Sequence, residues 1–139
     1  MTQFVLDCSM AMTWCFEDET TALSEAVLAR LARDTALVPA IWPFEVANVL
    51  AVAARRRRLT EAQSTGFLGL LAQLPIVVAD GSSLQVAAAS LAIARGRGVC
   101  AYDAAYLELA MREAVPLATC DKALAKAANE AGVALLDVG

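Results

Sequence analysis

The stretch "QFVLDCSMAM" (residues 3–12) combines the features that indicate how the chain folds. The apolar run at residues 3–6 has the length of a short buried strand, and Asp7 ends it. A helical pattern follows, predicted over residues 9–16. When a strand passes straight into a helix, the next strand can return parallel to the first, because parallel strands need a crossover connection.

The same alternation continues along the chain. Further β-type runs predict strands at residues 36–40, 75–79, 116–119 and 133–137. Helical periodicity predicts helices at residues 20–33, 43–57, 60–72, 82–95, 102–113 and 121–131. We therefore expect the α/β class: a three-layer α/β/α fold with a parallel sheet of four to five strands. No repeat or linker interrupts the pattern, which predicts a single domain over residues 1–139.

The amino-acid composition excludes several classes of enzyme. The 139 residues contain no histidine, which excludes Ser-His-Asp triads, HExxH metalloproteases and histidine-coordinated deaminases. The four cysteines, Cys8, Cys15, Cys100 and Cys120, form no CxxC pair. A zinc ribbon is therefore not expected, and the thiols are predicted to be reduced. Any catalysis would have to depend on carboxylates.

Hydropathy indicates a protein that folds without a membrane. Hydrophobic residues make up 59% of the chain. A single domain of this length can bury about two-thirds of the surface that its unfolded chain would expose. No apolar run reaches the ~18 residues of a membrane span. We therefore expect a cytoplasmic protein.

Charge is distributed unevenly along the chain. The net charge of −4 disfavours a polyanionic partner, since binding nucleic acid requires cations. Residues 55–126, however, hold nine of the eleven basic residues and only six acidic ones. A basic groove would have to come from Arg55 to Arg58, Arg95, Arg97 and Lys122. The alternative for the four consecutive arginines is the solvated C-terminal end of a helix, which the helix dipole favours.

Four carboxylates are predicted to meet at one edge of the sheet. Asp7 ends the first strand and Asp121 follows the fourth, while Glu45 and Asp103 lie in the first turns of helices. Ligand sites of such sheets lie beyond the carboxyl ends of the strands, where helix N-termini also gather.

Each carboxylate also has a structural alternative. Asp121 is a suitable N-cap for the last helix, and Glu45 would complement a helix dipole. Glu45 has no capping-box partner, however, because Trp42 is expected at the N-cap. Asp103 precedes Leu107 and Ala110 on one helix face, which is expected to be buried. A buried Asp7 must have its charge satisfied.

A divalent cation would resolve the repulsion among four acids. Mg²⁺ or Mn²⁺ suits oxygen ligands, and either can lower the pKa of a bound water and offset charge on a phosphate without a histidine base. The chemistry that follows is phosphodiester hydrolysis. Ser9, Thr119 and Asn48 are expected to assist at this edge, or to serve only as local cap and turn residues.

Four segments together resemble a known family. They are "FVLDCSM" (4–10), "PFEVANVL" (43–50), "AYDAAYLELA" (101–110) and "LATCDKALAKAA" (117–128). In order and spacing they resemble PIN-domain ribonucleases of the VapC toxin type, almost from end to end. The resemblance implies a Mg²⁺- or Mn²⁺-dependent endoribonuclease that forms a homodimer and is inhibited by a cognate VapB-like antitoxin. RNA, rather than DNA, as the substrate rests on this resemblance alone.

The resemblance also assigns roles to residues. It places the catalytic set on Asp7, Glu45, Asp103 and Asp121, associates metal contact most directly with Asp7 and Asp103, and puts Ser9 and Thr119 at smaller polar positions. We predict Asp7, Asp103 and Asp121 as the metal ligands. Apolar surface for a second copy and for an antitoxin helix is expected near four aromatic residues at helix starts. These are Trp14, Phe16, Trp42 and Phe44.

Two other functions compete with this prediction. An aspartate-based phosphotransfer domain also carries acids at strand ends, but the second acid expected two residues after Asp7 is replaced by Ser9. A non-catalytic α/β interaction module would use all four acids as caps. Metal dependence of stability separates these classes, because a domain whose acids are only caps is indifferent to millimolar Mn²⁺.

Overall fold

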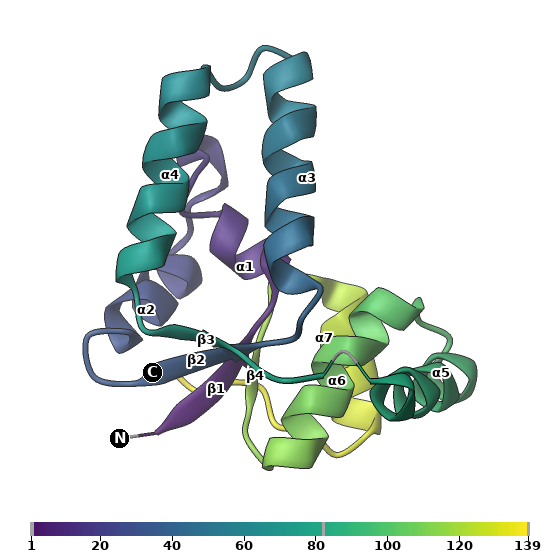
Figure 1. The fold of residues 1–139 in the computed structure, drawn as a ribbon. Helices are drawn as coiled ribbons and strands as arrows, with labels where there is room; N and C mark the ends of the chain where they lie inside the picture. The colour runs from purple at the N-terminus through teal and green to yellow at the C-terminus, as the bar shows by residue number, and fades with distance from the viewer. Residues whose placement is uncertain (1, 82, 139) are drawn as a thin grey trace.

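The computed structural model describes residues 2–81 and 83–138, arranged around one parallel sheet (Figure 1). The strands are β1 (Gln3–Leu6), β2 (Thr35–Val38), β3 (Ile76–Val78) and β4 (Leu117–Ala118), in the spatial order β3-β2-β1-β4. Val5 of β1 lies opposite Leu37 of β2 and Leu117 of β4. All pairings are parallel, so the residues that follow β1 and β4 meet at one edge.

Helices cover both faces of the sheet, which confirms the predicted three layers. They are α1 (Cys8–Met12), α2 (Ala22–Arg30), α3 (Trp42–Arg55), α4 (Glu61–Gln73), α5 (Leu84–Arg97), α6 (Ala101–Glu113) and α7 (Lys122–Glu130), with a 3-10 turn at Glu17–Glu19. Helices α1 to α4 lie on one side of the strands and α5 to α7 on the other (Figure 1). The α3–α4 pair extends away from the sheet as a hairpin.

Prolines shorten three of the predicted strands. Pro39 follows β2, Pro75 precedes β3 and Pro116 precedes β4. Proline has no N–H to donate to a ladder, although Pro75 and Pro116 each still accept a bond from the neighbouring strand through the carbonyl. The predicted strand at 133–137 is reduced to one parallel bridge, between Leu117 and Leu135. Because β4 has only two residues, little backbone remains for a fifth strand to pair with.

The predicted helices are all present, with shifted ends. The helix expected at 9–16 ends at Met12, where the Thr13 hydroxyl donates to the Met10 carbonyl at 2.6 Å and competes with helical bonding. The helix expected at 82–95 is α5, which Ser83 caps; residue 82, like residues 1 and 139 of the predicted domain, lies outside the described residues.

The core forms around β1. Phe4, Val5 and Leu6 are fully buried and pack with Leu107 and Leu117. Each such side chain contributes about 1.5–3 kcal/mol by leaving water. This packing stabilises β1, and Asp7 directly follows β1 at the edge of the sheet. No helix in the described part of the chain is long and apolar enough to span a membrane.

Candidate active site

Asp7 is held in place by hydrogen bonds from two strand ends. It caps α1, with Oδ1 accepting from the Met10 N–H at 2.9 Å. Its Oδ2 accepts from the Thr119 hydroxyl at 2.5 Å, and the Ser9 hydroxyl lies 2.8–2.9 Å from both oxygens. Only 4% of Asp7 is exposed. The predicted requirement that its charge be satisfied is therefore met.

Burial nevertheless makes the Asp7 charge costly. The pKa of Asp7 is raised to about 6: desolvation is the largest cause and the charge of Asp121 adds to it, while the bonds from Thr119, Met10 and Ser9 oppose the rise. Asp7 is thus a carboxylate that a cation would stabilise in its ionised form.

Ser9 and Thr119 connect the loops after β1 and β4. The Thr119 oxygen accepts from the Asp121 N–H at 2.9 Å, and the Ser9 oxygen accepts from the Cys120 N–H at 3.1 Å. Both hydroxyls therefore orient Asp7 and fix the segment that carries Asp121. Asn48, the third residue predicted to assist, is exposed and lines a neighbouring cleft.

Asp121 is the N-cap of α7, the structural role proposed for it as an alternative to metal binding. Its Oδ1 accepts from the N–H groups of Ala123 and Leu124 at 2.9 and 3.1 Å, at the start of α7. Its charge also raises the pKa of both Asp7 and Asp103. Asp121 thus serves as a cap and lies close enough to the other acids to interact with them.

Asp103 is the third residue of α6 and does not cap it. The cap is Cys100, whose Sγ accepts from the Asp103 N–H at 3.4 Å. The Asp103 side chain is half-buried, and burial followed by the charge of Asp121 raises its pKa. Leu107 and Ala110, which were predicted to form a buried helix face with Asp103, are both buried.

Glu45 is held across the domain by a residue that the sequence did not single out. The Tyr106 hydroxyl donates to Glu45 Oε1 at 2.5 Å and joins α6 to α3. Burial raises the pKa of Glu45, the Tyr106 bond lowers it, and the charge of Asp103 raises it. The N-cap of α3 is Ile41 and not Trp42 as expected, a shift of one residue that leaves Glu45 in the first turn. Spacing offered one signal for Tyr106, which follows Asp103 by one helical turn.

A cleft of about 690 Å³ is lined by Ser9, which bonds to Asp7, although none of the four predicted acids lines it. Ser9, Cys8 and Cys120 line it near the acids, Val49 and Val52 line its apolar wall, and Arg56 and Arg58 lie along it as well. This cleft is large enough to hold a short segment of a polymer chain.

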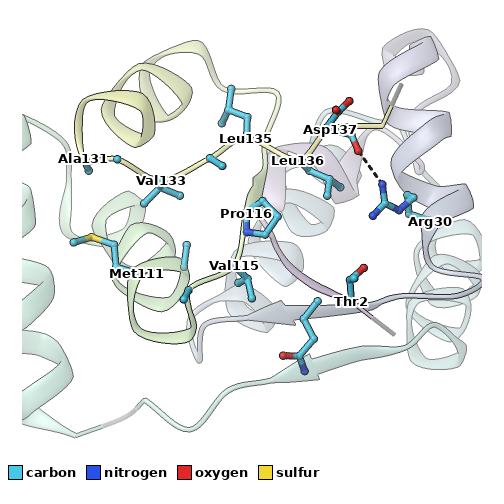
Figure 2. Close-up of a pocket in the computed structure, with 15 residues that line it drawn as sticks. Thr2, Arg30, Met111, Val115, Pro116, Ala131, Val133, Leu135, Leu136 and Asp137 are labelled. Atoms are coloured by element: carbon cyan, nitrogen blue, oxygen red, sulfur yellow. Dashed lines mark hydrogen bonds between the residues drawn. The ribbon is translucent and has the colours of Figure 1, made fainter.

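A second cavity lies at the opposite edge of the sheet. Its volume is about 730 Å³, and Figure 2 shows Thr2, Val115 and Leu135 among the residues that line it. Arg30 donates to the Asp137 carbonyl at 2.8 Å at its rim. It adjoins the amino ends of β1 and β4, and none of the four predicted acids lines it.

The donors at the acidic edge match a hard cation in chemistry, but they do not form a closed cage. Within residues 2–81 and 83–138, no three His, Cys, Asp or Glu side chains lie close enough together to hold a metal ion. The donors present are carboxylate and hydroxyl oxygens. Mg²⁺ commonly uses one or two carboxylates and completes its shell with water and substrate oxygens. The residues therefore fit a Mg²⁺ held by a pair of acids better than a cation enclosed by protein.

The arginine run is the end of a helix, as its alternative reading proposed. α3 ends at Arg55, and Arg58 is paired with Asp18 at 3.0 Å and Glu19 at 3.3 Å while lying over the Phe16 ring. Arg95 and Arg97 are in the last turn of α5, which Figure 1 places well away from the end of α3. The two groups of arginines therefore do not lie side by side, and the helix-end alternative describes residues 55–58.

Solved structures share this fold over nearly the whole chain. PAE2754 from Pyrobaculum aerophilum has a TM-score of 0.69 at 22% identity, covering 91% of this chain and 87% of that one. VapBC2 from Rickettsia felis, bound to a DNA fragment from its promoter, has a TM-score of 0.68 at 13% identity, covering 98% of both chains. FitAcB from Neisseria gonorrhoeae has a TM-score of 0.64 at 19% identity, covering 99% of this chain and 98% of that one.

Sequence comparison gives the family. A search of curated proteins found no match. The PIN domain model, however, matches residues 4–130, a range that contains all four predicted acids. The resemblance predicted from four segments is confirmed, and the chain belongs to the PIN-domain family.

Proposed function

We propose that this protein is a VapC-type toxin: a metal-dependent endoribonuclease that hydrolyses RNA phosphodiester bonds in the cytoplasm. The observation that carries the proposal is the acidic edge of a PIN domain, where the charge of Asp121 raises the pKa of Asp7 and Asp103, and the charge of Asp103 raises that of Glu45. Acids concentrated in this way favour a divalent cation, and the absence of histidine leaves carboxylates to do the chemistry.

We assign a different role in the reaction to each group of residues at the acidic edge. Two carboxylates at a time from the predicted ligands Asp7, Asp103 and Asp121 would hold Mg²⁺ or Mn²⁺, with water and substrate oxygens as the remaining ligands. The ion would supply a water of lowered pKa and offset charge on the phosphate. Ser9, Thr119 and the Met10 N–H keep Asp7 oriented. Glu45 would orient the attacking water and accept its proton.

The cleft offers a place for an antitoxin segment. Its wall is apolar at Val49 and Val52, and it runs beside the acids at Ser9. We infer an amphipathic helix lying on this wall, with an Arg or Lys directed at the carboxylates in place of the metal. The solved VapBC2 and FitAcB complexes support a cognate antitoxin as the partner.

Exposed apolar residues support a homodimer. Leu84 is 88% exposed, Phe44 73%, and Val77 and Val78 on the edge strand about half. Of the four aromatic residues expected to leave such surface, Phe44 does so, whereas Phe16 and Trp42 are buried and Trp14 is half-buried. The proposed interface combines β3, the start of α3 and α5, and light scattering that finds only monomer at micromolar concentration would exclude it.

The proposed activity is tested with matched nucleic acids. Purified protein is incubated in Mn²⁺ with a labelled structured RNA and with DNA of the same sequence. We expect internal cleavage of the RNA in its single-stranded regions, little cleavage of the DNA, and loss of RNA cleavage when the antitoxin is added. Intact RNA in every sample would favour the non-catalytic interaction module instead.

A further inference from the structure

Tyr106 is a buried phenol that contacts the acidic site from the core. Only 1% of it is exposed, and its hydroxyl donates to Glu45 Oε1 at 2.5 Å across 61 residues of sequence. The bond links α6, which carries Asp103, to the first turn of α3. Tyr106 is therefore placed to control how one carboxylate of the site is presented.

The acids differ in how firmly they are held. Asp7 has hydrogen bonds at both oxygens, and Asp121 is bonded to two backbone N–H groups. Glu45 has a longer and more flexible side chain, and the donor found for it among the described residues is Tyr106. Without that donor, the rotamers of a half-buried glutamate would be free to exchange.

We propose that Tyr106 is the positioning residue for Glu45, fixing Oε1 so that Oε2 is the oxygen offered to the attacking water. This inference rests on the proposed nuclease function. Reactions depend steeply on such placement, because a 1 Å displacement of a reacting group can cost about 100-fold in rate.

Tyr106 acts through Glu45 and does not transfer the proton itself. Burial, followed by the hydrogen bond to Glu45, raises the pKa of the Tyr106 phenol far above its ordinary range. The phenol thus stays protonated and remains a donor. Its bond to Glu45 is a fixed restraint over the whole pH range in which the enzyme would work.

The test compares the two tyrosines of the chain, both of which lie in α6. Tyr106→Phe removes one hydroxyl from a buried site, and Tyr102→Phe removes one from a residue that is 60% exposed. We expect Tyr106→Phe to lower kcat roughly 10- to 100-fold, with KM and the affinity for Mn²⁺ changed less than about twofold. Tyr102→Phe should match the wild type. Tyr106→Phe with wild-type kcat would overturn the inference.

A double-variant cycle tests whether the effect passes through Glu45. If it does, Glu45→Ala and Glu45→Ala/Tyr106→Phe have equal residual rates, whereas a further drop in the double variant would overturn the inference. Urea unfolding of the same variants covers the case in which the wild type cleaves no RNA. That result would reject the proposed function. Non-additive destabilisation would still support the Tyr106–Glu45 restraint, and additive effects would reject it.

Discussion

Replacing Asp7 with asparagine is expected to lower kcat by roughly 10³-fold, about 4 kcal/mol of barrier, while the chain stays folded. Asparagine keeps an oxygen for the Met10 N–H, and the Thr119 hydroxyl can rotate to accept from the new amide. What is lost is the negative charge that a hard cation prefers. Single-turnover cleavage and circular dichroism measure the two effects separately.

Asp34→Asn is the matched control for Asp7→Asn. Asp34 is also a buried aspartate, but it pairs with Arg30 at 2.7 Å near the amino end of β2. Arg30 holds the pKa of Asp34 down at about 2. We expect this variant to melt lower and to cleave RNA at the wild-type rate. Full activity in Asp7→Asn would remove Asp7 from the site.

Asp7 also gives the metal-free protein a characteristic pH dependence. Its folded pKa of about 6 is above the ordinary 3.8, so its contribution to folding is complete below about pH 4 and is lost as the pH rises through 6. From pH 5 to 7.5 this amounts to roughly 1 kcal/mol. In EDTA the wild type should therefore melt higher at pH 5 than at pH 7.5, and Asp7→Asn should show a smaller difference.

Asp103→Asn is expected to abolish RNA cleavage and, in EDTA at neutral pH, to raise the melting temperature. Burial and the charge of Asp121 raise the pKa of Asp103, so its ionised form opposes folding when no cation is bound. Removing the charge relieves that repulsion. Added Mn²⁺ should then stabilise the variant less than it stabilises the wild type.

Glu61→Gln is the control for Asp103→Asn, and its melting temperature is expected to change in the opposite direction. Glu61 is an exposed acid in the first turn of α4, so its loss removes only a favourable interaction with the helix dipole. This control should melt slightly lower than the wild type, with or without metal. If Asp103→Asn behaves like Glu61→Gln and still cleaves RNA, Asp103 is an ordinary helix-start residue.

The sequence was most informative where a buried strand meets a charged residue. Asp7 could be predicted because a carboxylate at the end of an apolar strand has few ordinary explanations, and parallel topology then placed the residues after β4 beside it. Glu45 and Asp103 could be assigned to first turns because helical periodicity fixes such positions within a few residues.

Long-range side-chain contacts could not be predicted in the same way. From the sequence alone, Tyr106 is indistinguishable from an aromatic residue of the core. Its hydrogen bond to Glu45 depends on how α6 packs against α3. Arg58 was counted toward a basic groove, yet it pairs with Asp18 and Glu19 from another segment. The prediction of a fifth strand at residues 133–137 was wrong because the neighbouring strand β4 is too short to pair with it. The length of β4 depends on backbone pairing, which hydropathy does not encode.

Metal dependence of RNA cleavage tests the central claim most directly. The protein is dialysed against EDTA, mixed with the labelled RNA, and assayed as Mn²⁺ or Mg²⁺ is added back. The carboxylate mechanism predicts no cleavage in EDTA and a saturable return of activity with either ion. Cleavage at an unchanged rate in EDTA would contradict it.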